Sequence, residues 1–376
     1  MPKTHSIHYP LSGLFALNKP SGITSMALLD SLKPLFGYSQ LFKPHEDAPP
    51  PLPSDKKKKG NKWRKSRGGG ARGVGGYAVK VGQGGTLDPL ADGVLVVGLN
   101  KGTKKLADLL NCSKEYTTIG LLGCETDSYD SEGAVVSKSR WQHITKSDIE
   151  NALEGFRGEI DQLPPIFSAI KIEGKRLFEY ARAGETPPKP VEKRKCTIHS
   201  LTLEEFIPGD KHAFRYPMKE LSSEDKEAAQ KAQEFVASGT DDKSEEKADD
   251  EKVDKVLEGS EEPQEEPSEQ ADKEVRPPTA FKLRMTVSGG TYVRSIVHDL
   301  GKALGSSAHV VELTRTRQGE FALANASTED GGVSTGSNVL DWSVFEKALA
   351  EKSDEYKEGE LQEWEQDLMR VIRTDI

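Results

Sequence analysis

The chain has 376 residues, enough for one large domain or two ordinary ones, but its hydrophobic content of 35% is low for a chain folded along its whole length. No apolar run reaches the roughly 20 residues of a membrane helix, and the N-terminal residues have neither a secretory-signal layout nor an Arg-rich amphipathic stretch. We therefore expect a soluble intracellular protein. The cysteines, Cys112, Cys124 and Cys196, form no CxxC pair, so we infer neither a zinc site nor a disulfide framework.

The formal net charge of −9 is distributed very unevenly along the chain. Residues 219–275 carry far more Asp and Glu than Lys and Arg, whereas residues 43–77 are rich in Lys, Gly and Pro. Neither composition can bury a core, so both segments are predicted to be disordered insertions. The rest of the chain is mildly basic, and a nucleic-acid partner is therefore compatible with it.

Apolar periodicity predicts the elements between the two ends of the chain. Before the acidic insertion the predicted elements are a strand at 13–18, a helix from Thr24 or Ser25, a strand at 94–99 buried on both faces, a helix at 103–110, a strand at 115–123, a helix at 146–158 capped by Ser147, a helix at 176–184 stopped by Gly184, and a strand at 195–206. After it they are a strand at 281–290, a helix at 291–305, a last core strand at 309–319 and a polar helical tail. The pattern indicates an α+β fold.

The stretch GGTLDPLADGVLVVGL, residues 84–99, puts a carboxylate on a tight turn directly before the buried strand. Pro89 keeps Asp88 away from helical backbone angles. An Asp-Pro pair is also a common ordinary turn, so the stretch by itself favours no particular chemistry.

A second stretch, SGGTYVRS at 288–295, carries an aromatic and a cation around a valine. In an extended segment Tyr292 and Arg294 share one face. A guanidinium group can hold a carboxylate in a bidentate pair and keep it ionised, which suggests a partner for Asp88.

Other patterns are weaker. ETDSYDSEG, at 125–133, lacks the final Glu of a calcium loop and is interpreted as a solvated turn. There is no GK[ST] phosphate loop or HExxH pair. One carboxylate, one Arg and the aromatic residues Tyr116 and Tyr292 suit chemistry on a nucleic-acid base without metal or cofactor.

Together the motifs resemble the TruB family of pseudouridine synthases. GGTLDPLADGVLVVGL is similar to its catalytic-Asp motif, and SGGTYVRSIVHDLGKALGSSAHVVELTRTRQGEF to its Tyr-x-Arg motif. The other matching segments are LNKPSGITS at 17–25, SKEYTTIGLLGCETDSYDSEG at 113–133 and DQLPPIFSAIKIEGKRLFEYARAG at 161–184.

The resemblance implies a pseudouridine synthase fold with a mixed, mostly antiparallel sheet and flanking helices. It implies isomerisation of uridine 55 in the T-loop of tRNA, with no cofactor. Asp88 is then the nucleophile, Tyr116 stacks on the flipped base and accepts a proton, and Arg294 pairs with Asp88. The remaining implied substrate-binding roles are Tyr292 beside Asp88, Leu313 under the base, Lys19 and Pro20 supporting the Tyr116 side, and Gln83.

Gln83 departs from the bacterial pattern, which has His in the place that the target base leaves. The resemblance implies a catalytic domain made of residues 1–42, 78–218 and 276–323. The C-terminal extension, residues 324–376, lacks the strand pattern of an RNA-binding PUA domain. Additional tRNA contacts are therefore assigned to the basic run 56–67, for which a nuclear-import signal or a linker is an equal alternative.

Two other functions remain open at this point: a guide-dependent, dyskerin-like subunit, and a catalytically silent tRNA-binding chaperone. We expect a monomer that acts on the tRNA T-arm and does not bind membranes. Modification of mRNA, and a nuclear, cytoplasmic or mitochondrial location, are not decided by the sequence.

Overall fold

The computed structural model describes residues 9–43, 78–222, 277–327, 332–351 and 360–374. The basic run 56–67 and nearly all of both predicted insertions lie outside these residues. The folded body extends past the predicted boundary at 218, because Val135 donates its backbone N–H to the carbonyl of Lys219 and accepts a bond from Leu221. Within the described ranges no helix is long and apolar enough to cross a membrane.

A ten-stranded sheet forms the body, in the order β14–β1–β3–β12–β4–β11–β10–β7, with β2 on β3 and β13 on β12. The pairs are antiparallel except β14–β1 and β3–β12, so the sheet is mixed and mostly antiparallel, as predicted. Its strands are β1 (Gly13–Lys19), β2 (Val81–Gln83), β3 (Asp92–Leu99), β4 (Lys114–Leu122), β7 (Gly158–Gln162), β10 (Arg194–Ile207), β11 (Ala280–Val287), β12 (Ala308–Gln318), β13 (Phe321–Ala322) and β14 (Val339–Asp341). Two small hairpins stand apart, β5 (Cys124–Thr126) with β6 (Val135–Lys138) and β8 (Lys171–Ile172) with β9 (Lys175–Arg176).

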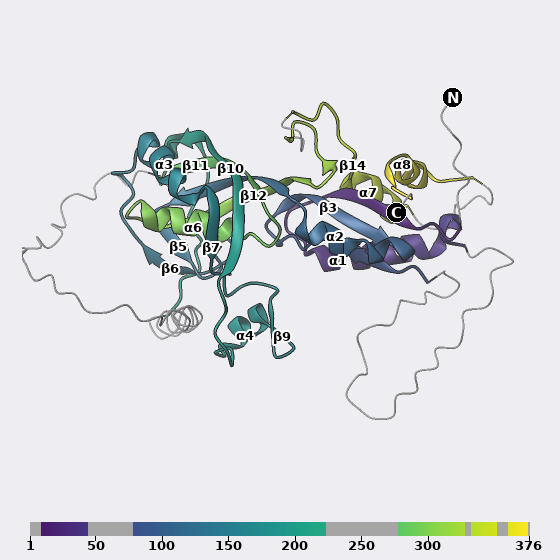
Figure 1. The fold of residues 1–376 in the computed structure, drawn as a ribbon, viewed down its shortest axis with the longest axis horizontal. Helices are drawn as coiled ribbons and strands as arrows, with labels where there is room; N and C mark the ends of the chain where they lie inside the picture. Colours follow the sequence, from purple (N-terminus) through teal and green to yellow (C-terminus); the bar gives the residue numbers. More distant parts are fainter. Residues whose placement is uncertain (1–8, 44–77, 223–276, 328–331, 352–359, 375–376) are drawn as a thin grey trace, which may run out of the picture.

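The helices and strands form two lobes (Figure 1). One lobe has α1, α2, α7 and α8 around β1 and β3, and the other has α3 and α6 beside β4, β10 and β11. The β3–β12 pairing, through Thr314–Asp92 and Arg315–Gly93, joins them. The helices are α1 (Ser25–Tyr38), α2 (Leu106–Asn111), α3 (Lys146–Ala152), α4 (Leu177–Ala183), α6 (Val293–Ala303), α7 (Trp342–Ala350) and α8 (Glu363–Val371), with short 3-10 turns η1 (Gln40–Phe42), η2 (Asn100–Lys104), η3 (Leu153–Phe156) and η4 (Gly209–Lys211).

The helix ends follow local capping chemistry. The Thr24 hydroxyl accepts a bond from the backbone N–H of Ala27 and starts α1. Gly184 ends α4 at a φ of 63°, in the left-handed region that glycine tolerates. The predicted Ser147 cap is wrong: Thr145 caps α3 in a capping box with Asp148, two residues earlier.

The C-terminal extension is anchored on the first lobe. Strand β14 pairs in parallel with β1, and Phe345 of α7 and Trp364 of α8 pack against Phe15 and Phe36. Phe345 and Trp364 are buried, and each such side chain contributes roughly 1.5–3 kcal/mol by leaving water. The segment predicted as a polar tail therefore completes this lobe's core.

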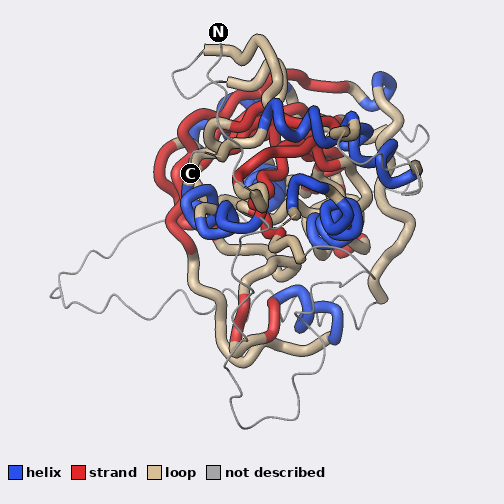
Figure 2. The backbone as a smooth tube through the Cα atoms, turned by 90° about the vertical axis from the view of Figure 1, so that its right-hand side faces the viewer, coloured by secondary structure: helices blue, strands red, loops and turns tan. Residues whose placement is uncertain are grey.

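The β8–β9 hairpin and α4 project from the second lobe (Figures 1 and 2). A small apolar cluster around Leu177 and Val191, separate from the main core, supports them. The segment before this projection lies at the N-terminus of α6, since Arg294 of α6 donates to the carbonyl of Phe167.

Candidate active site

Hydrogen bonds to α1 hold the turn that carries Asp88. The hydroxyl of Ser25, in the first turn of α1, donates to the carbonyl of Leu87 at 2.9 Å and accepts from its N–H at 3.0 Å. The backbone N–H of Ala91 bonds to the carbonyl of Asp88, which closes the turn before β3. The side chain of Asp88 remains 36% exposed. The turn thus presents a carboxylate to solvent on a fixed backbone.

Arg294 pairs with Asp88 across the junction of the lobes. Its Nε lies 2.8 Å from Asp88 Oδ2, and the Arg294 side chain is only 4% exposed. Its Nη1 donates to the carbonyl of Ser128 at 2.6 Å and its Nη2 to that of Phe167 at 2.9 Å. The guanidinium is therefore held from three sides, and the predicted pairing of Asp88 with Arg294 is present.

The details of that pairing differ from the prediction. Arg294 lies in the first turn of α6, with Tyr292 as the N-cap, so the two residues do not share a face of an extended segment. The contact with Asp88 is through Nε alone rather than bidentate, because the two terminal nitrogens are used by backbone carbonyls. Those two bonds fix the direction in which Nε points.

A second carboxylate, Asp130, stands behind the guanidinium, with Oδ2 3.7 Å from Arg294 Nη1. Burial raises the pKa of Asp130, although Arg294 acts in the opposite direction. Burial alone would lower the pKa of Arg294, but Asp88 and Asp130 outweigh it and raise it above its ordinary value. Arg294 therefore stays charged.

The stretch 125–133 is consequently not the solvated turn that we predicted. Ser128 and Asp130 are buried, and the Ser128 hydroxyl donates to Asp130 Oδ1 at 2.6 Å. The backbone N–H of Val310 on β12 bonds to the carbonyl of Tyr129, which pins the turn to the sheet. Of the alternating acids that suggested solvation, Asp130 lies against the guanidinium of Arg294.

Lys19 lies at the Asp88 turn. Its Nζ donates to the carbonyls of Pro20 at 2.7 Å and Ile23 at 2.8 Å, and more weakly to that of Pro89 at 3.4 Å. The side chain is fully buried, so it and Pro20 join the N-terminal turn to the residue after Asp88. Burial lowers the pKa of Lys19 to about 8, against the attraction of Asp92 and Asp88.

A pocket opens between the lobes beside Asp88. Tyr116 from β4, Leu313 from β12 and Tyr292 before α6 line it together with Asp88 and Arg294. Tyr116 is 8% exposed and Leu313 is 7% exposed. An aromatic ring and an aliphatic side chain thus lie in the wall of the pocket that contains the carboxylate.

Tyr292 is positioned by Gln162 of β7. The Gln162 amide donates to the carbonyl of Tyr292 at 2.9 Å and accepts from its N–H at 2.7 Å. Burial raises the pKa of the Tyr292 hydroxyl, so it is protonated at neutral pH. Gln162 was not among the predicted residues, since nothing in its local sequence points to the site.

Gln83 lies next to the pocket rather than among the residues that line it. Its Nε2 donates to the Thr86 hydroxyl at 3.0 Å, while its Oε1 is buried without a hydrogen-bond partner among the described residues. Thr86 and Gly85 line the pocket. Gln83 therefore contacts the strand-to-turn segment that leads to Asp88.

Two cations in the pocket wall, Arg315 and Lys114, were not predicted from the sequence. Arg315 donates to the carbonyls of Val94 and Gly85, and so holds the segment before Asp88 from the β12 side. Lys114 donates to three carbonyls at the end of α2, among them that of Leu110. Burial lowers the pKa of Lys114, with Cys112 opposing and Arg315 reinforcing this effect.

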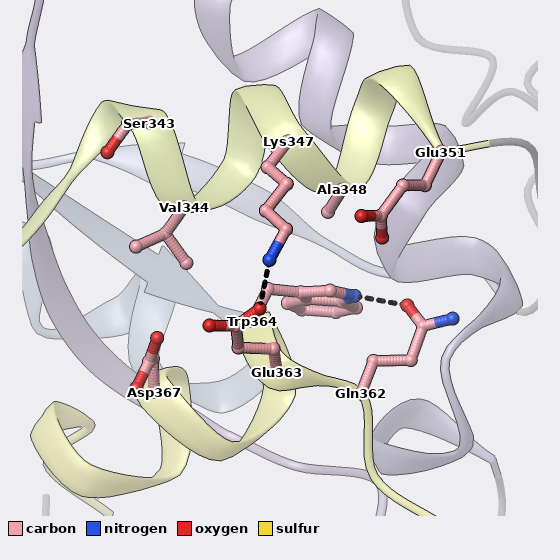
Figure 3. Close-up of a pocket in the computed structure, with 9 residues that line it drawn as sticks. All are labelled: Ser343, Val344, Lys347, Ala348, Glu351, Gln362, Glu363, Trp364 and Asp367. Carbon is pink, nitrogen blue, oxygen red and sulfur yellow. Dashed lines mark hydrogen bonds and ion pairs between the residues drawn. The ribbon is translucent and has the colours of Figure 1, made fainter.

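A separate groove lies between α7 and α8 (Figure 3). Lys347 of α7 pairs with Glu363 of α8 at 2.5 Å, and the Trp364 indole N–H donates to Gln362 at 2.7 Å. It contains none of the predicted site residues.

Two family models match large parts of the chain. Residues 75–220 match the family model described as "TruB family pseudouridylate synthase (N terminal domain)", and residues 294–362 match that of the "tRNA pseudouridylate synthase B C-terminal domain". The chain belongs to the TruB family of pseudouridine synthases, which confirms the predicted family.

Two curated relatives and one solved structure illustrate the similarity. "tRNA pseudouridine synthase 4" of Schizosaccharomyces pombe is 37% identical over 344 residues, covering 85% of this chain and 81% of the relative. "Pseudouridylate synthase TRUB1" of Mus musculus is 34% identical over 85% of this chain and 67% of the relative. The crystal structure of a Cbf5–Nop10–Gar1 complex aligns with a TM-score of 0.45 and 20% identity, over 96% of this chain and 60% of the other.

Proposed function

We propose that this enzyme converts uridine 55 in the T-loop of tRNA to pseudouridine, with Asp88 as the nucleophile. The observation that carries the proposal is the partly exposed Asp88 carboxylate, paired at 2.8 Å with a guanidinium that two carbonyls hold in place. An oriented carboxylate is one of the nucleophiles that covalent catalysis uses.

The proposed reaction is an isomerisation, so no atom is gained or lost overall. The C1′–N1 bond of the uridine breaks, the base rotates while Asp88 holds or stabilises the ribosyl or base fragment, and a C1′–C5 bond forms. The proton on C5 is then removed, with Tyr116 as the acceptor that we assign, and N1 gains a proton. This balance needs no oxidant, reductant or cofactor.

The pocket also suits a flipped base. A uridine inside a stack cannot reach Asp88, and extrusion costs a few kcal/mol, least where the base is already partly unstacked. RNA loops provide such bases, and proteins that read RNA loops commonly stack them on aromatic rings. Tyr116 offers a ring and Leu313 an apolar contact in the same pocket.

tRNA as the substrate is supported by the printed names of the relatives, including those of the two yeast proteins. We further propose that the enzyme acts as a monomer on the T-arm without a guide RNA. Modification of mRNA uridines is a second proposed activity of the same site, since the pocket needs only one flipped uridine and its flanking loop.

The test is position-resolved pseudouridine mapping on an unmodified tRNA transcript incubated with the full chain. We expect product at position 55, none with Asp88→Ala, and wild-type product with Asp210→Asn, an exposed acid on η4 that serves as the matched control. Product only after a guide RNA is added would favour a dyskerin-like enzyme. Binding without product in the unaltered chain would favour a tRNA chaperone.

A further inference from the structure

His298 lies one helical turn after Arg294 on α6 and touches the same neighbouring segment. Its ring is 3.8 Å from that of Tyr129, nearly parallel at 17°, and its side chain is 5% exposed. Tyr129 follows Ser128, whose carbonyl holds Arg294 Nη1. Two residues on one face of α6, Arg294 and His298, therefore contact the 127–130 turn.

Both ring nitrogens of His298 meet carboxylates. Nε2 lies 3.0 Å from Glu125 Oε1 on β5, and Nδ1 lies 2.8 Å from Asp299 Oδ1 on α6. An ionised carboxylate only accepts hydrogen bonds, and a neutral imidazole has only one N–H to donate. Satisfying both contacts at once therefore requires the imidazolium form.

The surrounding charges agree with this protonation state. Burial alone lowers the pKa of His298, but the bonds to Asp299 and Glu125 outweigh it and raise the pKa above its ordinary value. Burial raises the pKa of Glu125, but His298, Lys302 and the Ser137 hydroxyl together bring it below its ordinary value. Glu125 is thus an anion next to a buried cation.

The other groups around this cluster do not remove its charge. Lys302 Nζ, also on α6, lies 3.9 Å from Glu125 Oε1 and is mostly solvated. His309 of β12 bonds to the carbonyl of Cys124, and burial lowers its pKa, so it is neutral. Burial raises the pKa of the Tyr129 hydroxyl, so that group is neutral as well.

We propose that His298 is a positioning residue for the isomerisation: as an imidazolium bound to Glu125 and stacked on Tyr129, it fixes the 127–130 turn, and through the Ser128 carbonyl it fixes Arg294 and Asp88. It touches neither the pocket nor the nucleophile. When His298 loses its proton, one carboxylate loses its donor and the turn loosens. Turnover then falls with little change in tRNA affinity.

The sign of the pH effect follows from the raised pKa. The contribution of the charged ring is complete below about pH 6.5, the ordinary histidine value, and is lost as pH rises through the higher pKa of the folded protein. The inference uses the proposed tRNA reaction only as an activity readout, because the titration of the ring can be followed without any substrate.

The first measurement is the NMR titration of the histidine ring resonances in the full chain, with the His298 signal assigned by its loss in His298→Gln. We expect His298 to titrate above pH 6.5 and the midpoint to fall in Glu125→Gln. A midpoint at or below 6.5 that Glu125→Gln leaves unchanged would overturn the proposal even if the tRNA reaction were wrong.

The second measurement is turnover against pH with saturating tRNA. His298→Gln should lower kcat about tenfold at pH 6.5, the effect of one charge-assisted hydrogen bond, and leave KM within about twofold. Arginine is a permanent planar cation that can stack on Tyr129. His298→Arg should therefore have a higher kcat than His298→Gln, and its kcat should fall less than that of the wild type as the pH rises. His199→Gln, exposed on β10, is the control. If kcat of His298→Arg fell at alkaline pH as steeply as kcat of the wild type, the proposed positioning role of His298 would be refuted.

Discussion

Two acidic side chains lie near the same guanidinium, Asp88 at Nε and Asp130 at Nη1, and they differ in exposure. Asp88 lies 2.8 Å from Arg294 and is 36% exposed, whereas Asp130 lies 3.7 Å away and is 6% exposed. Only Asp88 lines the pocket. The comparison indicates that access to the pocket, and not the ion pair itself, separates the proposed nucleophile, Asp88, from Asp130.

The largest effect is expected for Asp88→Asn. The amide keeps the size of the side chain but removes the nucleophile, so turnover should fall by roughly a thousandfold or more while the tRNA Kd stays within a few-fold. Single-turnover assays with saturating enzyme separate the two quantities. A variant that reacts within tenfold of the wild type would remove Asp88 from the mechanism.

Arg294→Lys should have the next largest effect. Lysine keeps the charge but cannot bond to Asp88 and also reach the Ser128 and Phe167 carbonyls in the same fixed geometry. We expect about a hundredfold loss of kcat and a loss of about 1–3 kcal/mol in the free energy of unfolding, because buried carbonyls lose their donors. Arg215→Lys, exposed after η4, is the matched control for urea unfolding and turnover. Equal kcat in the two variants would contradict the positioning of Nε.

Asp130→Asn sharpens the comparison directly. It retains an oxygen for the Ser128 hydroxyl but removes the negative charge behind Arg294. Since the nucleophile is intact, kcat should fall only about tenfold, which corresponds to about 1.4 kcal/mol. Asp127→Asn, in the same turn but bonded to the backbone of Ala134, should stay near wild type. A loss as large as that of Asp88→Asn would mean that the two carboxylates share the chemistry.

Lys19 provides a pH-dependent prediction about the turn beneath Asp88. Its pKa of about 8 is below the ordinary lysine value, so between pH 8 and 10.5 the unfolded chain binds more protons than the folded one. The contribution of Lys19 to stability therefore rises with pH in that window, by about 2–3 kcal/mol. Urea unfolding of the wild type and Lys19→Met at pH 7.5 and 10 measures it. The free energy of unfolding of the wild type minus that of Lys19→Met should be larger at pH 10 than at pH 7.5. A value that is constant or falls with pH would contradict the buried position of Lys19.

The smallest effect is expected for removal of residues 224–272, outside the described ranges. Their composition offers no core, so deletion with a short Gly-Ser linker should leave kcat and the melting temperature nearly unchanged. Extending the deletion to begin at 219 should lower the melting temperature, because Lys219 and Leu221 bond to Val135. Loss of soluble protein from the shorter deletion alone would show that the acidic segment is structural.

The sequence predicted the parts of the site that local rules determine. Asp88 stands in an Asp-Pro turn before an apolar run, and Gly84 and Gly85 precede it, so its position on a turn before a buried strand follows from neighbouring residues. The α6 helix was also predicted from its own residues, because its apolar side chains recur at helical spacing. The pairing with Arg294 came from chemical complementarity and from the resemblance, not from spacing.

The remaining contacts depend on segments far apart in the chain. Ser128, Phe167 and Asp88 reach Arg294 from three separate elements, and no local pattern encodes their meeting. The 125–133 stretch is polar by composition, and its burial arises because α6 and β12 cover it. The bonds from Lys19 to the carbonyls of Ile23 and Pro89 were not predicted, because a Lys-Pro turn does not specify which turn lies against it.

The most direct test of the account is a structure of the Asp88→Asn variant bound to a tRNA T-arm, where the lost nucleophile leaves the substrate unreacted. We predict that the target uridine is flipped into the pocket, with its C1′ about 3–3.5 Å from the substituted side chain and its base against Tyr116. Arg294 should keep its bonds to the Ser128 and Phe167 carbonyls. A uridine that stays stacked in the T-loop, or that enters the molecule away from position 88, would contradict the account.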